Sequence, residues 1–271
     1  MKDIDFEKKD YTYLQWAKAR SSSGTAGSFL KATEVKDGKK IYYKLSNFDS
    51  MHGIVGHESI NEIIVSRLLD ILEINHLSYH LVYGDVKIGT KIYTTYFCRS
   101  ESFRNKGDRK ITFEDYYEIE KMDDETPLDF VKRCGWEREF SQMLLVDFLI
   151  LNRDRHGANI EVIMNSKGNV HLAPLFDQGI SLMFNCYNDD EVEAFDILED
   201  KAVQSFVGSN SAKENLKRIR SEFANSVVAL KKEDKEYIFA GLDRTLSKKH
   251  IDKIWDMIWK RWSYYEGMFN L

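Results

Sequence analysis

The segment that most constrains the fold runs from Phe140 to Asn152 and carries apolar residues on nearly all sides. A helix that is apolar all round has to be covered by the rest of the chain. Polar residues follow at once, because the stretch from Leu151 to Ile163 reads LNRDRHGANIEVI. A rigid buried helix that ends in a polar loop is a good support for reactive side chains. We therefore predict a buried helix followed by a functional loop.

Three polar residues beyond this helix have a spacing that favours a shared site. Asp154 and Asn159 are five residues apart, and Asp177 comes eighteen residues later in the sequence APLFDQG. The intervening segment reads as two short strands around a Lys-Gly-Asn turn, and such a hairpin would return Asp177 to the other two. Carboxylate and amide oxygens bind Mg²⁺, commonly together with substrate phosphates. In phosphoryl transfer one carboxylate takes the proton of the attacking hydroxyl, while an Asn and another Asp hold the metal.

The remaining pattern predicts an α+β fold, with a small mixed sheet in the first half and helices in the second. Residues 6–20 have apolar residues at helical spacing and are predicted as a short helix. Asp37-Gly38 predicts a hairpin turn between two strands, and residues 56–74 read as an amphipathic helix. Residues 78–97 read as two strands that turn near Gly84 or Gly89. Helices are predicted further on, at residues 111–122, 126–135, 210–230 and 247–269.

The pattern D-x-H-x-x-N, followed by two apolar residues and D-x-G, resembles the catalytic and metal loops of the HipA-like kinases. These kinases are a bacterial branch of the protein-kinase-like superfamily, and the phosphatidylinositol kinases share a similar DRHxxN loop. The resemblance implies that Asp154 is the catalytic base and that Asn159 and Asp177 bind magnesium. It implies that His156 ties the loop together, with an acid–base role for His156 as the alternative.

The resemblance also assigns roles to residues in the first half. The small-residue loop Ser21–Ala32 would cover the ATP phosphates, with Ser23, Gly24, Thr25 and Gly27 as binding residues. Lys44 would contact the phosphates, with Lys31 as competitor, and Glu62 would hold Lys44, with Glu58 as alternative. The adenine would lie against a hinge at residues 96–99, which gives Tyr96, Phe97 and Cys98 as further ATP-binding residues. The resemblance also implies that one hydroxyl residue of this loop is autophosphorylated, and the candidate acceptors are Ser21, Ser22, Ser23, Thr25 and Ser28.

The resemblance covers roughly residues 21–182 and implies a two-lobed kinase fold. We expect residues 1–98 to form a nucleotide-binding lobe and residues 99–271 a mostly helical catalytic lobe. The expected activity is transfer of the γ-phosphate of ATP, with magnesium, to Ser or Thr hydroxyls of a protein, including the chain itself. The alternatives are a lipid or small-molecule kinase and a nucleotide-binding pseudokinase.

Composition bounds the partners and the compartment. The net charge of −5 provides no general basic field, so we expect no binding to nucleic acid or to an anionic membrane. Neither a spanning apolar run nor a secretory leader is visible, and Cys98, Cys134 and Cys186 have no metal-ligand or disulfide spacing. We predict a cytoplasmic protein, with a secreted effector as alternative. The residues give no support to the antitoxin partner known for some HipA-like kinases.

Overall fold

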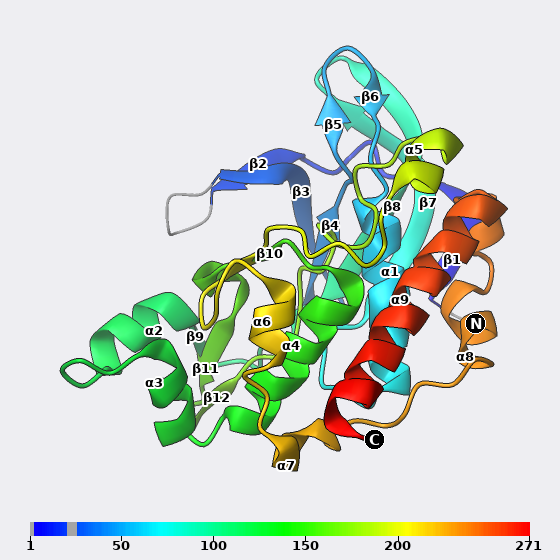
Figure 1. Cartoon of the computed structure of the whole chain (residues 1–271). Coiled ribbons are helices and arrows are strands. Elements are labelled where there is room, and N and C mark those ends of the chain that lie inside the picture. The colour runs from blue at the N-terminus through cyan, green and yellow to red at the C-terminus, as the bar shows by residue number, and fades with distance from the viewer. Residues whose placement is uncertain (1–2, 21–25) are drawn as a thin grey trace.

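The computed structural model describes residues 3–20 and 26–271. Its largest element is a mixed sheet with the strand order β1-β7-β8-β4-β3-β2 (Figure 1). Strand β1 runs parallel to β7, and the other neighbours are antiparallel. The strands are β1 (Ile4–Asp10), β2 (Ala17–Arg20), β3 (Ala26–Lys36), β4 (Lys39–Lys44), β7 (Tyr79–Ile88) and β8 (Lys91–Glu101).

Two hairpins of this sheet confirm the predicted turns. Asp37 and Gly38, between β3 and β4, both have positive φ angles, 52° and 76°, as a tight hairpin turn requires. Strands β7 and β8 turn at Gly89, whose φ is 61°, rather than at Gly84. Gly84 has another function, because a Cβ atom there would lie 2.1 Å from the carbonyl oxygen of Lys9. Glycine at this position therefore lets β1 approach β7.

The predicted helix over residues 6–20 is wrong, because the chain forms β1 and β2 there. Strand β1 adds to the sheet by pairing in parallel with β7, and β2 pairs with β3. Between the two strands, Tyr11 and Leu14 are buried in a hydrophobic cluster on one face of the sheet. Pairing with distant strands outweighed a short helical spacing of apolar residues, since tertiary contacts override local preference.

Helix α1 (Glu58–Ile71) packs on β7 and β8, on the other face of the main sheet (Figure 1). Every residue from Glu58 to Leu69 is buried, including the charged and polar ones. Its apolar residues belong to the larger hydrophobic cluster of the protein. The same cluster includes the apolar residues 140–150 of the predicted buried helix. The carboxylates of Glu58 and Glu62 thus lie inside the protein, where burial is unfavourable for any charge that lacks a partner.

The second half begins with a small sheet and three helices that confirm most predictions. Strands β9 (Arg109–Thr112), β11 (Glu161–Met164) and β12 (Val170–Leu172) pair in the order β12-β11-β9. Helix α4 (Glu137–Ile150) is buried from Phe140 onward, as its composition predicts. Two short helices precede it, α2 (Phe113–Glu120) and α3 (Pro127–Arg133). Short segments complete this part: β5 (Phe48–Asp49), β6 (Gly53–Ile54), β10 (Asp154–Arg155), η1 (Gly157–Asn159) and β13 (Gln204–Ser205).

The last part of the chain contains the long helix α9 (Lys248–Phe269), as predicted. The single helix predicted over residues 210–230 is wrong. Two short helices occupy that range, and Arg220 between them has an extended backbone, with ψ at 141°. Ser211 caps the first of them and accepts a hydrogen bond from the backbone N–H of Glu214. The helices here are α5 (Asp189–Ala194), α6 (Ala212–Leu216), α7 (Ser221–Ala224), α8 (Asp234–Phe239) and η2 (Leu242–Arg244).

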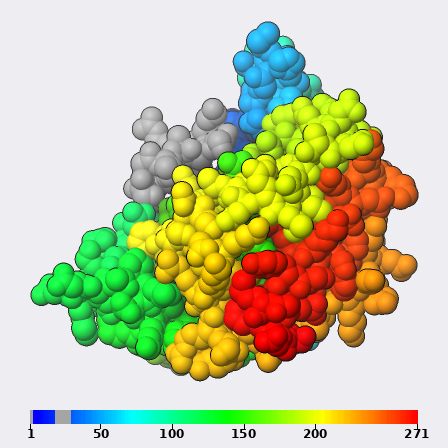
Figure 2. Space-filling view, viewed as in Figure 1, coloured from blue at the N-terminus to red at the C-terminus, as the bar shows by residue number. Residues whose placement is uncertain are grey.

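Helix α9 and the segment around α6 cover one face of the molecule, while the β5–β6 hairpin projects at the top of the view (Figure 2). Side chains of α9 such as Trp255, Ile258 and Trp262 are buried in the larger cluster. Among the described residues, no helix has both the length and the apolar character that crossing a membrane requires.

Candidate active site

A cavity of about 790 Å³ is lined by the main sheet on one side and by residues of the loop 154–159 and of Phe176–Asp177 on the other. The hairpin β11–β12 returns Asp177 toward Asp154 and Asn159, and all three residues line this one cavity. Lys31 and Lys44 line it from β3 and β4. The convergence expected from the spacing is therefore present.

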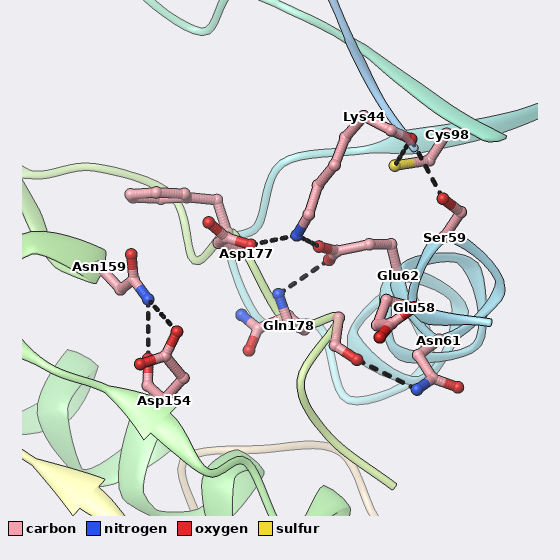
Figure 3. Close-up of polar contacts among 12 residues, drawn as sticks. Lys44, Glu58, Ser59, Asn61, Glu62, Cys98, Asp154, Asn159, Asp177 and Gln178 are labelled. Carbon is pink, nitrogen blue, oxygen red and sulfur yellow. Dashed lines mark hydrogen bonds and ion pairs between the residues drawn. The ribbon is translucent and has the colours of Figure 1, made fainter. Parts of the chain in front are cut away.

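Lys44 is the centre of a buried ion cluster (Figure 3). Its ammonium lies 2.9 Å from a carboxylate oxygen of Glu62, and it also donates a hydrogen bond to Asp177. Glu62 has no exposed surface, and its second oxygen accepts from the backbone N–H of Gln178 at 2.8 Å. Burial opposes the charge of Lys44, but Asp177 and Glu62 raise its pKa well above the ordinary value. Lys44 therefore stays charged.

Glu58, the alternative partner for Lys44, has a different contact. It accepts a hydrogen bond from the backbone N–H of Asn47 at 3.0 Å and supports the segment after β4. Burial raises the pKa of Glu62, and the Lys44 ammonium opposes this shift. Lys44 and Glu62, the pair preferred in the sequence analysis, are therefore the two residues in contact.

Asp177 lies between Lys44 and the Asp154–Asn159 pair in Figure 3. Its φ of 57° is left-handed, a conformation that costs free energy in a residue other than glycine. Its backbone N–H donates to the Tyr79 hydroxyl at 3.1 Å. Burial alone would raise the pKa of Asp177, but Lys44 and then Lys31 lower it below the ordinary value. The Asp177 carboxylate is therefore ionised and able to bind a cation.

Asn159 and Asp154 form the other half of the cavity wall. The Asn159 amide nitrogen donates to the backbone oxygen of Asp154 at 2.8 Å and to its carboxylate at 3.3 Å. This arrangement turns the Asn159 side-chain oxygen away from Asp154. Burial raises the pKa of Asp154; the nearby His156 opposes this shift, and Asp177 acts in the same direction as burial. His156 accepts from the backbone N–H of Ala158 at 3.2 Å, which closes the loop.

These oxygens fit a magnesium ion. Asn159 and Asp177 present an amide oxygen and an ionised carboxylate to the same cavity, and hard oxygen donors are what Mg²⁺ binds. Within residues 3–20 and 26–271, no three His, Cys, Asp or Glu side chains are grouped as metal ligands. A divalent ion at this place would therefore also need the Asn159 amide or oxygens from a ligand.

Arg155 is a site residue that the sequence analysis missed. Its buried guanidinium pairs with Asp147 of α4 at 2.9 Å and donates to the side chain of Gln178 at 2.6 Å. It also donates to the backbone oxygens of Asn159 at 3.1 Å and of Phe176 at 3.2 Å. One side chain thus joins α4, the loop and the residues on either side of Asp177. The signal that could have found it is Asp147, a lone acidic residue inside the apolar helix.

Arg155→Ala is expected to lower the free energy of unfolding by about 3–5 kcal/mol, because it leaves the Asp147 carboxylate buried without its cation. Denaturant-induced unfolding of the purified variant measures this difference. Arg153→Ala is the control, because Arg153 is half-buried and makes, among the described residues, one side-chain hydrogen bond, at the surface, to the backbone oxygen of Ala202 at 3.4 Å. We expect that control to change stability by less than about 1 kcal/mol. Equal effects of the two variants would contradict the role of Arg155.

The residues predicted as an adenine hinge are placed differently from the expectation. Phe97 has no exposed surface and packs in the smaller cluster, on the face of the sheet away from the cavity. Tyr96 packs beside Tyr83 in a tilted ring pair, with 4.6 Å between the ring centroids, and also does not line the cavity. Cys98 does line it, from within the sheet. Because β8 continues to Glu101, the cavity is bordered instead by residues 100–104.

The predicted phosphate loop can be placed only in part. Ser23, Gly24 and Thr25 lie outside the described residues, as do Ser21 and Ser22. Gly27 and Ser28 belong to β3, which leads directly to Lys31 at the cavity wall.

Comparisons with known proteins address the fold. No protein-family model matches the chain, and no curated protein matches its sequence. Among solved structures, the Helicobacter pylori proinflammatory kinase CtkA superposes with a TM-score of 0.61 at 17% identity, over 95% of this chain and 94% of that one. HipA, from the Shewanella oneidensis toxin–antitoxin complex of HipA, HipB and operator DNA, gives a TM-score of 0.46 at 16% identity, over 91% of this chain and 66% of that one. The likeness to CtkA shows that this chain shares the fold of that kinase, in agreement with the kinase fold that the resemblance of its DRHGAN and LFDQG motifs implied.

Proposed function

We propose that the chain is an ATP- and magnesium-dependent kinase that transfers the γ-phosphate to Ser or Thr hydroxyls of a protein, with autophosphorylation as one outcome. The observation that carries the proposal is the shared cavity. The buried cluster of Lys44, Glu62 and Asp177 and the pair of Asp154 and Asn159 line it together. Phosphoryl transfer requires positive charge to bind the phosphates and a carboxylate that serves as the general base.

Each residue of the cavity has a defined task in this proposal. Lys44 binds phosphate oxygens, and Glu62 fixes its position through the 2.9 Å ion pair. Asn159 and Asp177 would hold magnesium, which supplies positive charge against the phosphates when it is bound. Asp154 accepts the proton of the acceptor hydroxyl as the oxygen attacks. Its raised pKa makes it a stronger base than an ordinary aspartate.

We place the nucleobase at the end of the cavity bordered by residues 100–104. Phe103 and Phe176 line this end, and their ring centroids are 6.1 Å apart. Two aromatic side chains at one end of a cavity suit the flat face of a base. The proposal keeps the two lobes that the sequence predicts, residues 1–98 and 99–271, but moves the boundary between them. Because β8 ends at Glu101, we place the connection between the lobes directly after that residue.

Transfer of labelled phosphate tests the proposal. The purified chain is incubated with γ-labelled ATP and magnesium, alone and with a generic protein, with lipid vesicles and with small-molecule acceptors. We expect magnesium-dependent label on protein, at Ser or Thr residues located by mass spectrometry. Label only on a lipid or small molecule would overturn the acceptor class. Magnesium-dependent ATP binding without transfer to any acceptor would identify a nucleotide-binding module instead.

The pH dependence of kcat follows from Asp154. A general base works only when it is deprotonated, so activity is lost as pH falls through its pKa. Burial raises that pKa above the ordinary 3.8, and the net negative charge of the bound magnesium–ATP complex would act in the same direction. We expect the acid limb of the kcat–pH profile to lie above the ordinary aspartate value. An acid limb at or below 3.8 would contradict the assignment of Asp154 as base.

A further inference from the structure

Lys31 and Lys44 form an unusual pair in the main sheet. The register of β3 and β4 places the two residues directly opposite each other, so their side chains leave the same face of the sheet. Like charges at directly opposed positions destabilise a sheet. Both side chains line the cavity, where the repulsion is screened less than at an open surface. Such a pair is stable only with anions between or beside the two ammonium groups.

Asp177 is the anion that the two lysines share. One of its carboxylate oxygens accepts from Lys44, and the other lies 3.7 Å from the Lys31 ammonium. Lys44 has a second anion in Glu62, whereas the one ion pair of Lys31 among the described residues is that with Asp177. The side chain of Lys31 is 37% exposed, against 10% for Lys44. Lys31 is therefore the cation that can move to a ligand without leaving a buried charge unpaired.

We infer that Lys31 is a second phosphate-binding residue, which neutralises Asp177 before a nucleotide binds and whose ammonium moves to the phosphates of the nucleotide when it binds. The inference rests on the proposed function and adds a residue and an order of events to it. Release of Asp177 makes its oxygens available to a cation at the same moment as the phosphates arrive. Lys44, held by Glu62, stays in place throughout. Lys31 and Lys44 are thus two cooperating cations and not two candidates for one role.

Calorimetric titration in the presence of magnesium tests the inference, with ATP, inorganic tripolyphosphate and adenosine as probes. Lys31→Met is expected to weaken ATP and tripolyphosphate about tenfold, as loss of one charge-assisted hydrogen bond does, and to leave adenosine unchanged. Lys31→Arg is expected to restore most of the loss. Lys36→Met is the matched control, because Lys36 lies on the same strand, is exposed and is not at the cavity. We expect the Lys36 variant to bind all probes like wild type.

A second measurement examines Asp177 directly. Electron paramagnetic resonance titration of Mn²⁺ without nucleotide is expected to show binding about threefold tighter for Lys31→Met than for wild type, because the variant removes a positive charge from Asp177. Lys36→Met loses the same positive charge away from the cavity, so its Mn²⁺ affinity shows the effect of net charge alone. Identical Mn²⁺ binding by Lys31→Met and wild type would overturn the claim that Lys31 neutralises Asp177.

The outcomes separate the inference from the proposed function. Equal binding of ATP and tripolyphosphate by wild type and Lys31→Met, or an equal loss for adenosine, would overturn the inference while leaving kinase activity intact. Binding of tripolyphosphate that depends on Lys31, without phosphate transfer in the labelling experiment, would support the inference and contradict the proposed function. Wild-type protein that binds neither ATP nor tripolyphosphate would overturn both.

Discussion

Asp177→Ala is expected to remove the magnesium-dependent part of ATP binding, with a loss of affinity of about 100-fold or more in the presence of magnesium. The variant deletes an ionised carboxylate that faces the cavity between Lys44 and Asn159. It also frees the ammonium of Lys44 and of Lys31, so ATP without magnesium should bind at least as tightly as it binds wild type. Calorimetric titration with ATP, with and without magnesium, measures both effects.

The fold of this variant should survive, because Lys44 keeps its ion pair with Glu62. Asp123→Ala is the control, since Asp123 is exposed on the connection between α2 and α3 and is not at the cavity. If Asp177→Ala keeps the magnesium dependence of wild type, the metal is held elsewhere and the assignment of Asp177 is wrong.

Asp154→Asn is expected to reduce kcat by about 10²- to 10⁴-fold, the range of a general base, while the affinity for ATP stays within about threefold. Asparagine has the shape of aspartate and can keep the contact with Asn159, but it cannot take a proton. Single-turnover transfer of labelled phosphate measures the chemical step, and calorimetry measures the binding of ATP. Asp123→Asn again provides a matched control on an exposed carboxylate.

The division between kcat and affinity decides the role of Asp154. A comparable loss in both would mean that Asp154 acts as a metal ligand, as a carboxylate near Asn159 could. An unchanged kcat would remove Asp154 from the chemistry altogether. Its 3.3 Å contact with the Asn159 amide exists in either case, so only kinetics separates the two roles.

The parts of the site that could be predicted are those with local, strongly patterned sequence. Asp154 and Asn159 follow a helix whose apolar character alone indicates burial, and the hairpin that returns Asp177 has its own turn signal. Lys44 lies on a strand that the Asp-Gly hairpin signal identifies, and Glu62 lies on a helix that the helical spacing of apolar residues identifies. Their contact at 2.9 Å agrees with the pairing that the family resemblance implied.

The parts that could not be predicted depend on contacts between distant segments. Residues 4–10 form a strand because β7 is available for pairing, which no local pattern shows. The cavity border falls at residues 100–104 because β4 and β7 extend β8 beyond Cys98. Arg155 is buried by partners up to 23 positions away along the chain. Its sequence neighbourhood, between Asp154 and His156, looks like that of an exposed loop residue.

The central claim is that one cavity holds the phosphates, the metal and the base. A crystal structure of the full chain with Mn²⁺ and a non-hydrolysable ATP analogue tests it directly, because anomalous scattering locates the metal. The account predicts a manganese peak within bonding distance of Asn159 and Asp177, phosphates at Lys44 and the terminal phosphate facing Asp154. A nucleotide bound outside this cavity, or a metal peak remote from Asp177, would contradict it.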